Sequence, residues 1–216
     1  MQLGQNPSQL DSNRFFERFS IETINKNHLF GLGVAEGLKG NFVVLDGKFL
    51  KTTVLNTFLK TDTIAHKSVS NFVYTNVLSW KIGNVTAQID SLEQLVAFIE
   101  SYAQSQGLPK QEPFVFMLRL HINNIDYQVI DWPKDEAFEP MFYNQYAHLL
   151  HETDTGILLL GFLWPSEINI STNQKSKYIV YAVTETQKPA LVGALTGIEV
   201  KGNIEVYLPQ NQLTNK

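Results

Sequence analysis

The chain has 216 residues, of which 44% are hydrophobic and 18% are charged, a balance typical of a folded globular protein rather than of a disordered segment. Its formal net charge is -4 and its lysines and arginines are scattered, so we expect neither nucleic acid nor an anionic membrane surface as a partner. The absence of cysteine excludes disulfide bonds, thiolate metal sites and a cysteine nucleophile.

The N-terminus has no basic segment followed by an apolar one, and no apolar run reaches the roughly 20 residues that span a bilayer. We therefore expect a cytoplasmic protein. Residues 1–13 are expected to form a flexible segment, residues 14–208 a single domain that could divide into two sub-sheets near residue 110, and residues 209–216 a tail.

The first predicted element is a short helix, capped by Asp11 or Ser12 and ending at Asn25. A glycine-rich stretch follows at residues 30–37. Its Gly-x-Gly-x-x-x-Gly spacing departs from a dinucleotide-binding fingerprint, no clear strand precedes it and no helix follows it. We therefore interpret these glycines as positions where strands turn sharply or pack closely.

Three further signals are local and specific. Asp46-Gly47 between two apolar runs predicts a two-residue hairpin joining 42–45 to 48–51. Strands are predicted near 69–74 and 78–89. The strongest helix is 92–106, where Ser91 and Gln94 form a capping box and Gly107 and Pro109 end the helix. Its apolar stripe consists of Leu92, Leu95, Val96, Ile99 and Tyr102.

The second half is dominated by apolar runs. The run 114–120 predicts a strand covered on both faces, and Asn123-Asn124 is expected to turn it back into 125–131. A short helix is predicted over 137–150, and a strand over 156–164 that Pro165 would end. The last predicted strands are 179–184, 191–200 and 204–208, joined by turns at Lys188-Pro189 and Lys201-Gly202.

The predicted strands follow one another more often than they alternate with helices. This order favours the α+β class, with mixed, largely antiparallel sheets and few helices, over a doubly wound parallel sheet.

Several segments, in this order, resemble the acetolactate decarboxylase family. Phe30-Gly31-Leu32-Gly33 is similar to a Gly-Leu-Gly segment of that family, and two later segments resemble its Gly-Leu-Asp-Gly-Glu and Leu-Asp-Gly hairpin. Its Phe-Tyr-Ala-Ile-Arg-Ile strand and its Gly-Phe-x-x-Pro segment also have counterparts. These four counterparts are Gly37-Leu38-Lys39-Gly40, Leu45-Asp46-Gly47-Lys48-Phe49, Phe116-Met117-Leu118-Arg119-Leu120 and Gly161-Phe162-Leu163-Trp164-Pro165.

The resemblance spans about residues 14–208 and implies the family's fold and its zinc-dependent conversion of acetolactate to acetoin. The implied ligand positions, however, carry other residues. Two histidines of the family fall at Tyr178 and Val180, a third at approximately Leu191, and a glutamate at Asn41. Three neutral imidazoles can hold zinc and leave a position open for substrate, whereas valine and leucine offer no lone pair and tyrosine, with a pKa of about 10, is a poor ligand.

We therefore expect no metal cofactor, although zinc is the family's cofactor. An arginine that meets the substrate in the family falls near residues 129–131 and is missing here, whereas Arg119 keeps the arginine of the preceding strand. The former metal pocket is expected to be lined by Asn41, Arg119, Tyr178, Val180 and Leu191.

His148 and His151 lie three residues apart at the end of the predicted helix 137–150, with Glu152 beside them. On a helix the two imidazoles would share a face. The pair is therefore either part of a relocated metal site or a solvent-exposed helix end, where histidine suits the negative pole of the helix dipole.

Two functional hypotheses follow. The first is a non-catalytic member of the decarboxylase fold that binds a small organic acid or serves as an interaction module. Its similarity to the plant and prokaryote conserved domain, whose members self-associate, makes a homo-oligomer the expected assembly. The second is an active acetolactate decarboxylase, a carboxy-lyase of acetoin biosynthesis, with a displaced or altered metal site. Zinc content and acetoin formation distinguish the two.

Overall fold

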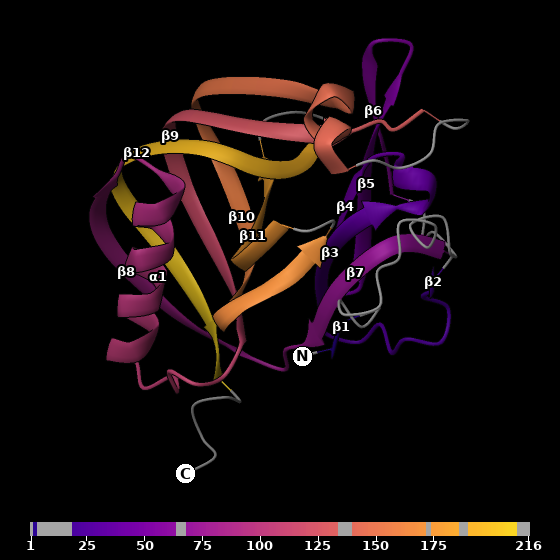
Figure 1. Ribbon diagram of the computed structural model, residues 1–216. Coiled ribbons are helices and arrows are strands. Elements are labelled where there is room, and N and C mark those ends of the chain that lie inside the picture. The colour runs from indigo at the N-terminus through magenta and orange to yellow at the C-terminus, as the bar shows by residue number, and fades with distance from the viewer. Residues whose placement is uncertain are drawn as a thin grey trace.

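The computed structural model describes residues 2–3, 19–63, 68–133, 140–171, 174–185 and 190–210. Their strands form two antiparallel sheets, accompanied by one α-helix within these ranges (Figure 1). The predicted α+β class is confirmed. No helix in the described ranges is long and apolar enough to cross a membrane.

The first sheet comes from the N-terminal part of the chain and has the strand order β1-β7-β3-β4-β5-β6, with β2 also paired to β7. A 3₁₀ helix, Glu36–Leu38, links β3 to β4. The strands are β1 Gln2–Leu3, β2 Phe19–Ser20, β3 Leu29–Ala35, β4 Asn41–Leu45, β5 Lys48–Leu55, β6 Phe58–Asp62 and β7 Ser68–Asn76.

The second sheet has the order β11-β10-β9-β12-β8, and β11 also pairs with β12, so β9 to β12 close into a circuit. The chain passes from the first sheet to the second between β7 and β8; the domain limits given above stay a prediction. Helix α1, Leu92–Ser105, follows β8, and a 3₁₀ helix, Pro140–Tyr146, precedes β10. The strands are β8 Trp80–Ile89, β9 Phe114–Ile130, β10 Ala147–Ser171, β11 Gln174–Thr184 and β12 Val192–Pro209.

The hairpin and the close packing of the glycines are both confirmed. Asp46 and Gly47 join β4 to β5 with φ angles of 48° and 76°, the left-handed conformations that a tight two-residue turn requires. Gly33 lies within β3, where a Cβ atom would be 2.2 Å from the carbonyl oxygen of Asn71 on β7. The glycine stretch is therefore a strand pressed against its neighbour.

Helix α1 begins and ends where its capping residues predict. The Ser91 hydroxyl accepts a hydrogen bond from the backbone N–H of Gln94 at 3.3 Å, while the Gln94 side chain accepts one from the backbone of Asp90. At the other end Gly107 has a φ of 90°, and the N–H of Leu108 donates to Ala103, which is a Schellman-type ending. The buried face of the helix consists of Leu95, Val96, Ile99 and Ala103.

Two apolar clusters hold the two sheets and helix α1 together. One lies between the sheets and combines Phe30 and Val43 of the first sheet with Val115 and Leu160 of the second. The other lies on the opposite face of the second sheet, beneath α1. Because alternate residues of a strand point to opposite faces, the strands β9 to β12 each contribute buried residues to both clusters, which explains their long apolar runs.

Two predicted interruptions of strands are wrong. Asn123-Asn124 does not turn the chain back; β9 runs through them because β10 and β12 continue to pair with it on both sides. Similarly, Lys201-Gly202 does not separate two strands but lies within β12, whose register against β9 shifts between Glu199 and Ile204.

The helix predicted over 137–150 is wrong in its described part. Residues 140–146 form the 3₁₀ helix, and from Ala147 onward the chain pairs with β9, so tertiary pairing overrides the local helical pattern. Pro165 does not end its strand either. The adjacent strand β9 begins opposite Leu163, and the register with β11 shifts between Leu163 and Ile168, so the missing N–H of Pro165 falls at an irregularity in the ladder.

The predicted N-terminal helix is also wrong where it can be assessed, because Phe19 and Ser20 form β2 and residues 21–25 contain a turn. Its preceding part lies outside the described residues, as does the predicted turn at Lys188-Pro189.

Two glycines of β10 provide a matched test of the packing. A Cβ at Gly161 would lie 2.3 Å from the ring of Phe116, which is fully buried, whereas a Cβ at Gly156 would meet nothing closer than 4.0 Å. We expect Gly161→Ala to lower the free energy of unfolding by about 1–3 kcal/mol and Gly156→Ala to leave it unchanged or raise it slightly. Urea denaturation of both variants checks this, and equal stabilities would contradict the packing described.

Candidate functional site

The two sheets are joined by polar contacts where β4 begins and β9 ends. The N–H of Gly40 donates to the carbonyl of Ile130 at 2.7 Å, and the Asn41 side-chain oxygen accepts from the N–H of Ile130 at 2.9 Å. Beside them Lys39 forms an ion pair with Asp131 at 2.7 Å. Gly40 is required here, because its φ is 95° and a Cβ would lie 2.1 Å from the carbonyl oxygen of Thr52. We call this region the inter-sheet seam.

Two fully buried polar side chains lie opposite each other on β4 and β5 at this seam. Thr52, the cross-strand partner of Asn41, accepts a hydrogen bond from the N–H of Val192 on β12 at 2.8 Å. Asn41 binds β9 through its oxygen only. By strict hydrogen-bond geometry its amide nitrogen has no partner among the residues that the structure describes, although it lies close enough to Tyr181 to lower the pKa of that phenol.

Two tyrosines complete the seam. Tyr181 on β11 is 2% exposed; burial raises the pKa of its phenol, nearby Tyr143 raises it further, and the Asn41 amide acts in the opposite direction. Tyr143, from the 3₁₀ helix before β10, is half-buried as a residue, and burial of its hydroxyl raises its pKa to about 12. Both phenols are therefore protonated at neutral pH, and the seam presents an amide and two hydroxyl groups.

The structure does not gather the five predicted pocket residues around one space. Within β11, Tyr181 belongs to the cluster between the sheets, whereas Tyr178 and Val180 face the cluster beneath α1. Leu191 also belongs to that second cluster. Asn41 is not part of that cluster, although Val192, next to Leu191, donates a hydrogen bond to Thr52 opposite Asn41. The roles of these residues in binding stay a prediction.

Arg119 lies elsewhere, on an exposed part of β9. Its guanidinium forms ion pairs with Glu185 at 3.0 Å and with Glu205 at 3.8 Å. Glu185 is the main reason that the pKa of Arg119 is raised. Because two carboxylates already surround this guanidinium, it offers little net positive charge to a further anion.

The sequence reasoning missed Tyr181, Tyr143 and Thr52. Strand periodicity indicates that Ile179 and Tyr181 share one face and that Tyr178 and Val180 share the other. It does not indicate which of these faces meets Asn41, because that depends on how the sheets pack. Nothing in the local sequence distinguishes Thr52 and Tyr143 from surface polar residues.

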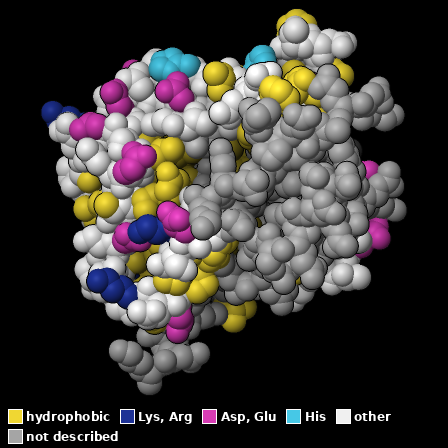
Figure 2. Space-filling view, in the orientation of Figure 1, with side chains coloured by type: hydrophobic (Ala, Val, Ile, Leu, Met, Phe, Trp, Pro, Cys, Tyr) yellow, Lys and Arg dark blue, Asp and Glu magenta, His cyan; other side chains and the backbone are white. Residues whose placement is uncertain are grey.

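The histidine pair does not share a face. His148 and His151 lie on strand β10 rather than on a helix, so residues three apart point to opposite sides. His151 Nδ1 lies 2.8 Å from Asp126 Oδ1. A hollow of about 490 Å³ near the start of α1 is lined by His151 and four carboxylates, Asp90, Glu93, Asp126 and Glu199. Acidic side chains are also visible on this side of the molecule (Figure 2).

The residues at the seam do not fit a zinc ion. Zinc is held by imidazole, thiolate or carboxylate lone pairs, and the amide nitrogen of Asn41 is an N–H donor, which repels a cation. Protonated phenols with raised pKa values are equally unsuited. Among the described residues, no group of three or more histidines, aspartates or glutamates is placed to hold a metal ion.

No protein-family model matches the chain, and no curated protein matches its sequence. Solved structures do match. An α-acetolactate decarboxylase from Bacillus subtilis strain 168 superposes with a TM-score of 0.71 at 14% identity, covering 90% of this chain and 79% of that one. A Staphylococcus aureus protein of unknown function, described as similar to α-acetolactate decarboxylase, gives 0.70 at 12% identity, covering 92% and 82%.

A third match, the acetolactate decarboxylase from Bacillus subtilis subspecies spizizenii, gives a TM-score of 0.69 at 13% identity, covering 90% of this chain and 80% of that one. At these identities the likeness shows the fold. The resemblance to acetolactate decarboxylases is thereby confirmed as a shared fold over nearly the whole chain.

The seam predicts an unusual pH dependence for Asn41→Asp. Burial would raise the pKa of the new carboxyl above its unfolded value of about 3.9, so the folded state would bind the extra proton and lose stability as the pH rises. We expect the variant to approach wild-type stability near pH 4 and to fall below it by about 1.4 kcal/mol per unit of pKa shift at neutral pH.

Urea denaturation at several pH values measures this difference. The matched control is Asn203→Asp, at an exposed position of β12, whose stability should follow the wild type at every pH. If Asn41→Asp also follows the wild type from acid to neutral pH, the seam is not the closed, water-excluding environment described here.

Proposed function

We propose that this chain is a non-catalytic protein of the acetolactate decarboxylase fold that binds a small organic acid instead of decarboxylating one. The observation that carries the proposal is the donor set at the seam, where Asn41 stands at the position that the resemblance gives to the family's glutamate. A cytoplasmic location is part of the same proposal.

The chemistry of the reaction supports this reading. Removing CO₂ from acetolactate leaves an enediolate, whose developing negative charge a bound metal ion would stabilise. At the seam, where Asn41 alone of the implied ligand positions lies, the interior is closed, since Asn41 is fully buried and Tyr181 is 2% exposed. A buried amide and protonated phenols supply hydrogen bonds but no ligands for such an ion. The same groups are well suited to fixing the two sheets together.

An active decarboxylase with an altered site is the second candidate. The likeness of fold over 90% of the chain to the Bacillus subtilis enzyme favours it. Its weakness is chemical, because no convergent set of three metal ligands can be named among the described residues.

Zinc content and turnover separate the two candidates. The protein is produced in zinc-supplemented medium, its metal content is measured by elemental analysis, and acetoin formation from acetolactate is followed. We expect substoichiometric zinc and acetoin formation no faster than in a protein-free solution. The Bacillus subtilis decarboxylase, prepared in parallel, is the positive control. One zinc per chain together with turnover would overturn the proposal.

Self-association is a further part of the proposal, and strand β8 is the surface that favours it. It is the terminal strand of the second sheet among the described strands, ten residues long, with Lys81 its only charged residue. The side chain of Ile82 on this strand is 55% exposed, and Leu78 just before it is 68% exposed. Long, weakly charged terminal strands with exposed apolar residues tend to pair with another chain.

We expect Ile82→Lys to shift the protein towards the monomer, since a lysine on a terminal strand opposes pairing. Analytical ultracentrifugation across a concentration series measures the shift. Leu149→Lys, at an exposed leucine of β10 three strands away in the sheet order, is the matched control and should leave the assembly unchanged. A wild-type protein that sediments as a monomer at all concentrations would contradict this proposal.

A further inference from the structure

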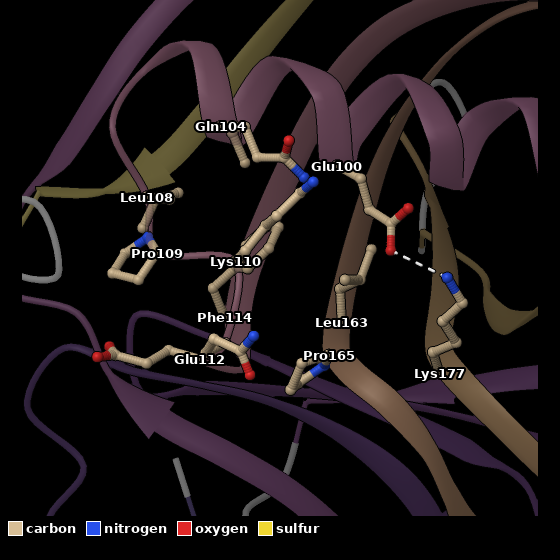
Figure 3. A pocket seen from close by; sticks show the side chains of 12 residues that line it. Glu100, Gln104, Leu108, Pro109, Lys110, Glu112, Phe114, Leu163, Pro165 and Lys177 are labelled. Carbon is tan, nitrogen blue, oxygen red and sulfur yellow. Dashed lines mark hydrogen bonds and ion pairs between the residues drawn. The ribbon is translucent and has the colours of Figure 1, made fainter.

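A cavity of about 370 Å³ lies between the C-terminal half of α1, the loop that follows it, and the strands β9, β10 and β11 (Figure 3). Its base is apolar and buried, whereas its rim is polar and, apart from half-buried Glu100, exposed. The base consists of Ala103, Leu108, Phe114 and Leu163, and the rim of Glu100, Gln104, Lys110, Gln111, Glu112 and Lys177. The cavity lies on the side of the second sheet opposite the seam.

The cavity exists because the second sheet opens at this end. Strand β9 begins at Phe114, opposite Leu163, so β10 loses its partner on that side beyond this pair. On its other side the register with β11 shifts between Leu163 and Ile168, around Pro165. Gly107 follows the C-terminal end of α1, and residues 108–112 of the loop that leads to β9 form part of the cavity wall.

The charged groups that face the cavity do not cancel one another. Lys177 is paired with Glu100 at 3.2 Å, so these two side chains neutralise each other. Lys110 makes no ion pair with any residue of the described ranges. Figure 3 shows its amino group extending toward Gln104 over the cavity, while the carboxylate of Glu112 points away from it. The groups that face the cavity therefore carry one net positive charge.

The C-terminal end of α1 repels an anion bound in this cavity only weakly. Carbonyl groups of a last helical turn are negative and would repel one. In α1, however, the carbonyls of Tyr102, Ala103 and Gln104 accept hydrogen bonds from the backbone N–H groups that follow them. The unpaired ammonium of Lys110 is thus the dominant charge at the rim.

We propose that this cavity binds a monocarboxylate with a hydrocarbon chain, with the carboxylate at Lys110 and the chain over Phe114 and Leu163. At about 30 Å³ for a water-sized group, the cavity holds on the order of ten non-hydrogen atoms, the size of octanoate. This inference rests on the proposed organic-acid binding function, for which it supplies a location and a ligand class.

The test is a titration of the protein with octanoate. Binding is monitored both by calorimetry and by NMR chemical-shift changes. We expect saturable binding of one octanoate per chain, with shifts concentrated at Phe114 and Leu163. Octylammonium, of the same length and opposite charge, should bind more weakly. Lys110→Glu should weaken octanoate binding about tenfold and reverse the preference between the two ligands, because the one unpaired charge that faces the cavity changes sign.

Lys201→Glu provides the matched control, since it changes the net charge equally at an exposed position of β12 outside the cavity lining. It should bind octanoate as the wild type does. Equal weakening by both variants, tighter binding of octylammonium to the wild type, or no saturation by octanoate would each overturn the assignment. None of these outcomes affects the zinc and acetoin result, so failure of this site remains distinguishable from failure of the proposed function.

Discussion

Buried polar groups that must find partners fix how the two sheets of this protein meet. Apolar side chains pack in many registers, but a buried N–H or carbonyl group left without a partner costs on the order of 1–3 kcal/mol. Asn41 and Thr52 therefore specify the packing, because each accepts a backbone hydrogen bond from the opposite sheet. Gly40 permits this approach, since a side chain there would collide with β5.

The same constraint determines what the seam can do chemically. A site that is to hold a cation needs lone pairs directed inward and open positions for substrate. Here the inward groups are an amide N–H and two phenols that stay protonated. A likeness of fold at 14% identity therefore leaves the activity open, because a fold does not determine which side chains line a site.

Local signals allowed part of this structure to be predicted. The turn at Asp46-Gly47, the Ser91 cap and the Gly107 ending depend on neighbouring residues only, and all three are correct. Strand limits were wrong where pairing with distant residues decides them, as at Asn123-Asn124 and at Pro165. The site was the hardest part. Periodicity separates the two faces of β11, but the face that meets Asn41 is chosen by the packing of the sheets.

The circuit formed by β9 to β12 has a consequence for biosynthesis. Strand β12 pairs with β8, β9 and β11, so the last of the described strands supplies pairing to three earlier ones. Residues 192–209 are synthesised after the other strands of this sheet, and until then β8 has no partner among the strands described here. The second sheet can therefore be completed only after β12 has left the ribosome. Until that moment its apolar strands are exposed to aggregation.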